Sequence, residues 1–355
     1  MALGPSSAAG SADTGLSGHR GLLALLTMGH LVNDFVAGAL WIIAPAIAAS
    51  MGLGPAEVGL ILTIYGVAAG LVYVPAGFLA DRVSNQGALL LISFWWVVVG
   101  YFLATIFPGF WPVTLLLALG VMGDAFWHPV ATGVLVKSVP KRRAQVLGIH
   151  AMGGSLGAEM LGPLCAGFLL GYFSWQTSLQ FLLIPPLLMG VMFLYFARFI
   201  PANGSEKITV PQLITLLGEW MTPRGGGIMV IMIAYNMALY GMLAMSPLIL
   251  QQVYGFSPFY TSILFAVMLV FGTVCQPFIG QFSDRVGRKG LIVTVVLGAA
   301  ACAFVAGLSE GFPVFISALV ASVSLLTAIR PVILAAAKST GSSPACHTGL
   351  YCRQS

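Results

Sequence analysis

The sequence predicts an all-α membrane protein built from two similar helical halves. Of its 355 residues, 59% are apolar and only 7% are charged, whereas soluble domains carry about a quarter charged residues. The segment 77–83, Gly-Phe-Leu-Ala-Asp-Arg-Val, returns at 280–286 as Gly-Gln-Phe-Ser-Asp-Arg-Val, each time between long apolar stretches. A charged pair is costly in hydrocarbon, so both copies belong in loops at the membrane surface. This layout is typical of secondary transporters, whose site lies where two halves meet.

Ten stretches are long enough to span a membrane, since roughly 20 apolar residues cross the hydrocarbon core. The predicted spans cover 22–49, 58–80, 88–107, 112–136, 144–172, 175–199, 227–254, 258–282, 291–308 and 312–337. The fifth span carries small residues that would permit close helix packing, namely Gly148, Gly153, Gly154, Gly157 and Gly162.

The basic residues predict the orientation of these spans. Arg20 precedes the first span, and every other Lys or Arg outside the spans follows an even-numbered span. The alternate loops contain no basic residue, only Glu57 and Glu310. The positive-inside rule therefore places the N-terminus, the Asp-Arg loops and the tail in the cytoplasm, with the protein in the inner membrane. This placement also accounts for the net charge of +5 without nucleic-acid binding.

The same pattern divides the chain into five parts. We expect a disordered cytoplasmic lead (1–20), a six-helix N-terminal half (21–200), a cytoplasmic central loop (201–226), a four-helix C-terminal half (227–337) and a polar tail (338–355). The lead lacks a basic n-region, so it does not read as a signal peptide. Metal binding by Cys346, His347 and Cys352 in the tail is a weak alternative, and we expect no metal or cofactor.

The two Asp-Arg loops resemble the cytoplasmic signature of the major facilitator superfamily, approximately G-x-L-x-D-R-x-G-R-R/K. The first copy has Asn85 and Gln86 where the signature has basic residues, while the second copy is close to complete. The resemblance covers 22–337 and implies a cytoplasmic gate formed by Gly77, Asp81, Arg82, Gly280, Asp284, Arg285, Arg288 and Lys289.

Shorter matches resemble the fosmidomycin-resistance branch, which consists of drug exporters. They are His-Leu-Val-Asn-Asp at 30–34 and Phe-Trp-His-Pro at 126–129, together with a Gly-x4-Gly-Pro run at 157–163 that resembles an antiporter signature. The superfamily has twelve spans, so we expect a C-terminally truncated chain that transports poorly, with a deliberately shortened protein as the alternative. A non-transporting remnant or a sensor is the rival function from another class.

Ionisable residues inside the spans are the candidate coupling groups. Asp34 lies about 18 Å from the cytoplasmic end of its span and Asp124 about 18 Å from the outer end of its own, so both are near the middle of a ~30 Å core. His30–Asp34 and Asp124–His128 are both i, i+4 pairs, so each pair shares a helix face. An imidazole beside a carboxylate suits a proton relay. The alternative is that both pairs are ordinary hydrogen bonds that hold helices together.

The remaining candidates concern the substrate. A shift of 202 residues sets His128-Pro129 on Arg330-Pro331, and the resemblance places Asp34, Asp124, His128, Asn236 and Arg330 around a central cavity. A buried Arg stays charged, so it must face Asp34, Asp124 or an anionic substrate. Glu159 would carry a proton or bond a neighbouring helix, and His150 would lie at the membrane interface. Asn33, Trp127, Tyr235 and Tyr240 are candidates for the substrate lining, with helix packing as their alternative.

Together these residues predict a transporter that moves a small organic compound by alternating access, with proton-coupled efflux preferred. Proton-coupled uptake of an organic acid or other metabolite is the alternative. We expect a monomer whose partners are the lipid bilayer, its substrate and protons. An enzyme is disfavoured because the aqueous segments contain no nucleophile–base pair, metal cluster or phosphate loop.

Overall fold

The computed structural model describes residues 19–139, 142–202, 214, 218 and 221–338. In this part of the chain, ten helical segments are long and apolar enough to cross a membrane. Their ends agree with the predicted spans to within a few residues, and the all-α fold is confirmed. The expectations for the lead, for most of the central loop and for the tail lie outside the described residues.

The N-terminal group contains six of these segments. Four are single helices: α1 (Arg20–Met51), α2 (Pro55–Arg82), α3 (Gln86–Ala104) and α4 (Phe110–Ser138). The fifth consists of α5 (Arg143–Ser155), the π-helical turn η3 (Leu156–Leu161) and α6 (Gly162–Leu170). The sixth consists of α7 (Trp175–Leu182), α8 (Ile184–Phe196) and the 3₁₀ turn η4 (Ala197–Phe199).

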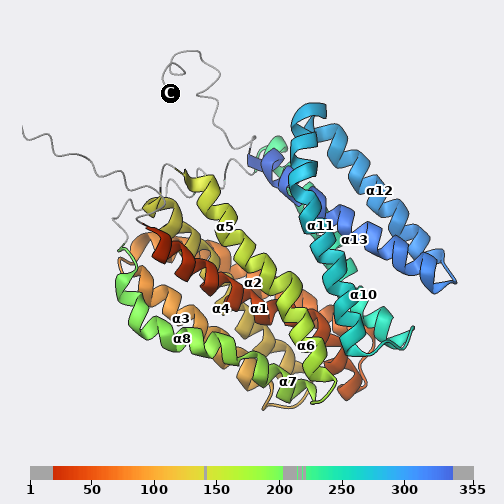
Figure 1. Cartoon of the computed structure of the whole chain (residues 1–355), viewed down its shortest axis with the longest axis horizontal. Helices are drawn as coiled ribbons and strands as arrows, with labels where there is room; N and C mark the ends of the chain where they lie inside the picture. Colours follow the sequence, from red (N-terminus) through yellow and green to blue (C-terminus); the bar gives the residue numbers. More distant parts are fainter. Residues whose placement is uncertain (1–18, 140–141, 203–213, 215–217, 219–220, 339–355) are drawn as a thin grey trace, which may run out of the picture.

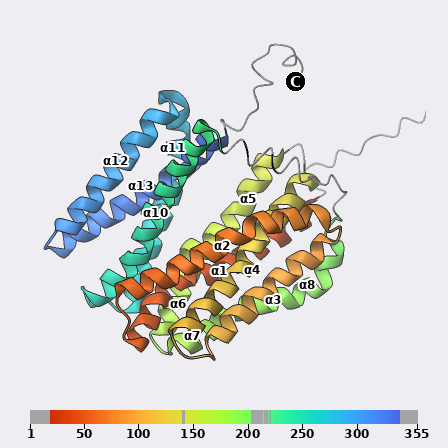
Figure 2. The same cartoon turned by 180° about the vertical axis from the view of Figure 1, so that it is seen from behind.

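The C-terminal group contains four helices, α10 (Pro223–Gln252), α11 (Pro258–Val286), α12 (Arg288–Leu308) and α13 (Phe312–Lys338). Figures 1 and 2 show the two groups side by side. The helices alternate in direction, so Arg20, Arg82, Lys137, Arg143 and Arg288 all belong to helix ends on one side of the bundle. We call this side the basic end.

Three pairs of prolines occupy equivalent positions in helices of the two halves. Proline removes a main-chain N–H and bends a helix. The internal prolines of six helices are Pro45 and Pro247, Pro75 and Pro277, and Pro129 and Pro331, each pair 202 positions apart. The two halves therefore carry a helix-bending residue at equivalent points.

The two Asp-Arg turns differ in structure as they do in sequence. Asn85 caps α3 by accepting a hydrogen bond from the Ala88 N–H at 3.0 Å. The buried Gln86 side chain donates to the carbonyls of Ala80 and Val83. In the second copy, Gly287 joins α11 to α12 with φ of +91°, a conformation that favours glycine. The first turn is thus stabilised by hydrogen bonds of the Asn85 and Gln86 side chains, whereas the second depends on the positive φ of a glycine.

The backbones of the fifth span and α1 lie in direct contact, with almost no side chains between them. A Cβ added to Gly153, Gly157 or Gly162 would lie within 2.4 Å of a main-chain carbonyl oxygen of α1, those of Thr27, Leu31 and Phe35 respectively. Glycine permits such backbone contact between membrane helices. The predicted role of these three glycines in close packing is confirmed.

The two groups of helices meet at the end opposite the basic end. A Cβ on Gly167 of α6 would lie 2.5 Å from the Ser262 Cβ of α11. Leu248 of α10 packs in one buried cluster with Ala44, Ala48 and Val58. Both views show the groups closest near α6 and the C-terminal part of α10, and diverging towards the basic end.

Candidate functional site

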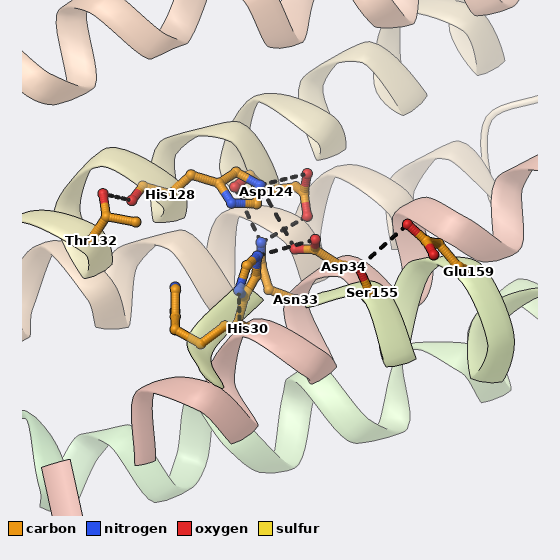
Figure 3. Close-up of polar contacts among 9 residues, drawn as sticks. His30, Asn33, Asp34, Asp124, His128, Thr132, Ser155 and Glu159 are labelled. Carbon is orange, nitrogen blue, oxygen red and sulfur yellow. Dashed lines mark hydrogen bonds and ion pairs between the residues drawn. The ribbon is translucent and has the colours of Figure 1, made fainter. Parts of the chain in front are cut away.

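Four ionisable side chains from α1 and α4 converge inside the N-terminal group (Figure 3). The Nε2 atom of His30 lies 3.2 Å from Asp34 Oδ2. The Nε2 atom of His128 lies 3.7 Å from Asp34 Oδ1 and also 3.7 Å from Asp124 Oδ2. We call His30, Asp34, Asp124 and His128 the His–Asp cluster. The predicted i, i+4 pairs therefore form one group rather than two.

Asn33 ties the two helices together beside the His–Asp cluster. Its side-chain Nδ2 donates to Asp124 Oδ1 at 2.7 Å and to the Asp124 carbonyl at 3.1 Å. Asn33 is fully buried, so its amide holds Asp124 in place rather than facing a cavity. This arrangement matches a positioning role better than the predicted contact with substrate.

The geometry around His30 fixes which nitrogen carries its proton. His30 Nδ1 lies 2.8 Å from the carbonyl oxygen of His150, which can only accept, so Nδ1 donates. A neutral His30 then presents an unprotonated Nε2 to Asp34. That contact is attractive only if one further proton is present, on His30 or on Asp34. A favourable contact at this distance therefore needs a proton between Nε2 and Oδ2 in addition to the one on Nδ1, and without it the contact would be repulsive.

His128 lies between two carboxylates on different helices. Because its Nε2 is equally far from Asp34 and Asp124, a proton on that atom can be shared with either acid. The rings of His30 and His128 lie edge to face, with their centroids 5.0 Å apart. The arrangement can accept, hold and pass on protons within the membrane.

The same side chains include donor types that bind divalent metals. One ligand atom each from His30, Asp34 and His128 lies within 4.8 Å of the other two. Imidazole and carboxylate suit zinc and similar ions. The ion pairs account for these short distances without a metal.

Glu159 lies in the π-helical turn of the fifth span and reaches the C-terminal group. Thr273 of α11 donates to Glu159 Oε2 at 2.5 Å, and Ser155 donates to Oε1 at 3.3 Å. π-helical turns are often found at functional sites, because the extra residue redirects side chains. Glu159 thus bonds a neighbouring helix, one of its two predicted roles, and the carboxyl remains available for a proton.

Arg330 lies in α13, before Pro331, and is exposed. In the described part of the chain, no Asp or Glu lies within ion-pair distance of its guanidinium. Of the two predicted types of partner, a protein carboxylate is therefore not in place here. An exposed, always-charged guanidinium is suited to binding an anion.

The aromatic and amide candidates lie in different surroundings. Trp127 is fully buried and packs against Phe94 and Phe193, which favours its alternative role in helix packing. Asn236 donates to the Met232 carbonyl of its own helix at 2.8 Å. Tyr240 is 50% exposed beside Trp41, with ring centroids 5.7 Å apart.

Tyr235 repeats the bond made by Asn33 in the other half. Its hydroxyl donates to the Leu326 carbonyl at 2.6 Å, as Asn33 donates to the Asp124 carbonyl. Both the donors and the acceptors are 202 positions apart, and both acceptors lie five residues before a helix-bending proline. The acids themselves are not repeated, since Asn236 and Leu326 stand at the positions equivalent to Asp34 and Asp124.

The predicted gate residues are found at the basic end. Asp81 pairs with Lys137 of α4 at 3.4 Å, and the Arg82 guanidinium lies 3.3 Å from the centre of the Phe78 ring. A pocket of about 380 Å³ adjoins this pair, lined in part by Gly77, Gln86 and Pro129.

In the second copy of the Asp-Arg loop, Arg285 and Lys289 are exposed, and Arg288 and Gly280 are half-buried. The side chain of Asp284 lies outside the described residues.

Sequence reasoning missed four contacts. His150 was expected at the membrane interface, but this is wrong: it is 1% exposed and its ring stacks on His30. Its i, i+4 spacing to Gly154 could have indicated an inward face. The partners Lys137 and Thr273 and the stacking of Tyr73 on His128 depend on contacts between helices, for which the sequence holds no local signal.

Comparison with known families gives one match over most of the chain. The model of the Major Facilitator Superfamily matches residues 26–345. The chain is 24% identical over 294 residues to the fosmidomycin resistance protein of Escherichia coli (strain K12), covering 79% of this chain and 69% of that protein. It is 23% identical over 320 residues to the hexuronate transporter of Bacillus subtilis (strain 168), covering 86% and 75%.

Solved structures show the same fold. A bacterial homolog of the human lysosomal transporter Spinster, in an inward-facing and unoccupied conformation, superimposes with a TM-score of 0.72 at 17% identity. The match covers 91% of this chain and 78% of that one. At this identity the likeness describes the fold alone.

Proposed function

The chain belongs to the Major Facilitator Superfamily and carries a small molecule across the membrane, and we propose that this molecule is an organic anion exported in exchange for protons. The His–Asp cluster would bind the protons, and Arg330 and His128 would orient the anion. Alternating access would come from rocking of the two halves around this site. The protein would lie in the inner membrane as a monomer, with its basic end in the cytoplasm.

The observation that carries this proposal is the one-proton contact between His30 and Asp34. A buried histidine whose second nitrogen is committed to a carbonyl can meet a carboxylate only when a proton is present. Structural ion pairs do not need so many ionisable groups: two acids and two histidines share one small buried volume here. Each is costly within a membrane, and such residues are commonly functional.

The anionic substrate is supported by the division of charges between the halves. The described acids of the site, Asp34, Asp124 and Glu159, belong to the N-terminal group, while the exposed Arg330 belongs to the C-terminal group. Relatives named for hexuronate and for tartrate make organic acids reasonable probes. The relative named for fosmidomycin resistance supports export, whereas uptake of an organic acid is the second candidate.

Reconstitution into liposomes tests the proposal directly. The purified chain is exposed to an imposed pH gradient with radiolabelled fosmidomycin, glucuronate or tartrate, and with glucose as the neutral control, while a pH-sensitive dye inside the vesicles follows protons. We expect any movement of an anion, however slow, to occur only with the gradient and with a matching proton signal. Movement of glucose alone, or anion movement that ignores the gradient, would contradict proton-coupled anion transport.

A further inference from the structure

His150 and Gly154 lie on the face of α5 that is turned to His30. They are four residues apart, so both side chains belong to the same side of the helix. The ring of His150 stacks on that of His30, with centroids 4.2 Å apart and planes inclined by 26°. The carbonyl of the same residue accepts the hydrogen bond from His30 Nδ1. His30 is thus held from one side by a single residue of another helix.

Gly154 leaves the space in which His30 meets Asp34. A Cβ at this position would lie 2.5 Å from His30 Nε2 and 2.9 Å from Asp34 Oδ2, closer than real Cβ atoms approach other heavy atoms. The neighbouring glycines 153, 157 and 162 face main-chain atoms of α1 instead. Gly154 is therefore distinguished by its contact with the two side chains that share a proton.

From these contacts we infer that His150 and Gly154 are positioning residues for the His–Asp cluster. His150 keeps the His30 ring oriented with Nδ1–H towards its carbonyl, and Gly154 lets Nε2 reach Asp34. The proton of the pair must then enter and leave through Nε2 of His30 or the carboxyl of Asp34. This role rests on the proposed proton coupling, but the geometry it describes can be measured without any substrate.

The surroundings of His30 show why the stacking ring matters. Asp34 faces it from α1, His128 and Asp124 from α4, and His150 from α5. Tyr73 of α2 stacks on His128, with ring centroids 5.8 Å apart. Glu159 of η3 interacts electrostatically with Asp34, and Arg330 of α13 interacts with His128. A charged ring at position 150 would repel a charged His30, whereas an uncharged aromatic ring preserves the stack. Phenylalanine can therefore replace the ring of His150, and alanine cannot.

Nitrogen NMR of the full chain, labelled with ¹⁵N-histidine in detergent micelles, reports the tautomer of His30. The His30 signal is assigned by its loss in His30→Gln. We expect Nδ1 to carry a proton in the wild type and in His150→Phe, whether the ring is neutral or doubly protonated, and a share of the Nε2–H tautomer to appear in His150→Ala and Gly154→Ala. Gly148→Ala is the matched control on α5, because a Cβ there meets no atom within 4 Å.

A second measurement connects the geometry to coupling. In liposomes with an imposed pH gradient, Gly154→Ala and His150→Ala should shift the pH profile of glucuronate or fosmidomycin movement and lose its gradient-driven part. His150→Phe and Gly148→Ala should keep both. A wild-type His30 tautomer in Gly154→Ala and His150→Ala would overturn the positioning role. Changed tautomers with no proton-driven transport in the wild type would instead uphold the role and reject the proposed function.

Discussion

At the scale of single residues, the site is organised by atoms that can only accept a hydrogen bond. The His150 carbonyl decides the tautomer of His30, and the Asp124 carbonyl receives Asn33. Main-chain carbonyls do not titrate, so they give fixed reference points among side chains that do. The four titratable members of the cluster can therefore change charge while the frame around them stays the same.

Replacing Asp34 by Asn tests whether its carboxyl carries the proton. Asn keeps the size of the side chain but cannot gain or lose a proton, so Asp34→Asn should abolish gradient-driven transport while the chain still inserts. The same outcome is expected for Asp124→Asn. Exchange of labelled for unlabelled substrate without a gradient serves as the control for folding. Full gradient-driven transport in both variants would assign the pairs a structural role only.

In the proposed mechanism, anion recognition depends on Arg330. Arg330→Gln should weaken binding of an anionic probe by at least about tenfold, which corresponds to roughly 1.4 kcal/mol. Arg330→Lys should recover part of the affinity but not the two-pronged geometry of a guanidinium. Binding is measured by calorimetry on the purified chain, with Arg198→Gln, a surface residue stacked on Tyr195, as the control. Unchanged affinity in Arg330→Gln would exclude this arginine from the site.

The sequence predicted a common level for Asp34 and Asp124, which both contact His128, but not the direction of a side chain around the helix axis. Depth follows from counting residues along a span, which is how Asp34 and Asp124 were placed at a common level. Direction depends on how helices pack, and this is why His150 was misassigned and why Asn33 was expected to meet substrate. Bonds such as Thr273 to Glu159 join spans that are far apart in sequence, so no local pattern marks them.

At the scale of elements, the fifth span has two different faces. One face lies backbone to backbone on α1 through Gly153, Gly157 and Gly162. The other face carries Glu159 to α11 through the π-helical turn. The glycine pattern predicted the first face, and a bond from Glu159 to a neighbouring helix was one of its two predicted roles. A π-helical turn has no reliable sequence signature, so neither the turn nor the partner Thr273 was foreseen. This span therefore connects the His–Asp cluster to the opposite half.

Adding a methyl group at Gly157 should destabilise this packing. The new Cβ would lie 2.1 Å from the Leu31 carbonyl oxygen, so α1 and η3 would have to separate. Overpacking of this kind costs about 1–3 kcal/mol, and Gly157→Ala should lower the thermal midpoint of the purified chain. Gly148→Ala, which meets no neighbour, should leave it unchanged or raise it slightly. Equal thermal midpoints for the two variants would show that the contact between α1 and η3 can adjust to the added methyl group.

At the scale of the whole molecule, the spans and their alternation were predictable because apolar length and basic loops are averaged over many residues. The relation between halves was also visible, since the Asp-Arg segments repeat at a near-constant shift. What the sequence did not predict is which ends of the halves touch. Those contacts, such as Gly167 against Ser262, involve small residues without a distinctive pattern.

Labelling of single cysteines tests the orientation of the whole protein. In a chain whose native cysteines are replaced, Arg143→Cys lies at the basic end and Phe107→Cys at the opposite end. A membrane-impermeant maleimide should label Phe107→Cys in intact cells and Arg143→Cys only after the membrane is opened, because basic loops stay in the cytoplasm. Labelling of Arg143→Cys from outside would reverse the orientation.

A cross-link between the halves tests whether they must separate during transport. Ala48 of α1 and Leu248 of α10 pack in one buried cluster at the end opposite the basic end, so Ala48→Cys with Leu248→Cys should form a disulfide on oxidation. If rocking opens this contact, oxidation should stop transport and a reductant should restore it. Each single-cysteine variant serves as the control. Undiminished transport by the cross-linked chain would argue against opening at this end.

The matching bonds of Asn33 and Tyr235 show how two halves can remain alike while their residues diverge. In each half the acceptor is a main-chain carbonyl, which every amino acid supplies, so a substitution can remove only the donor. Asparagine and tyrosine share no shape or volume, yet both can donate to the same point. The likeness between the halves is thus seen in which positions are joined by a hydrogen bond, even where the residues at those positions differ.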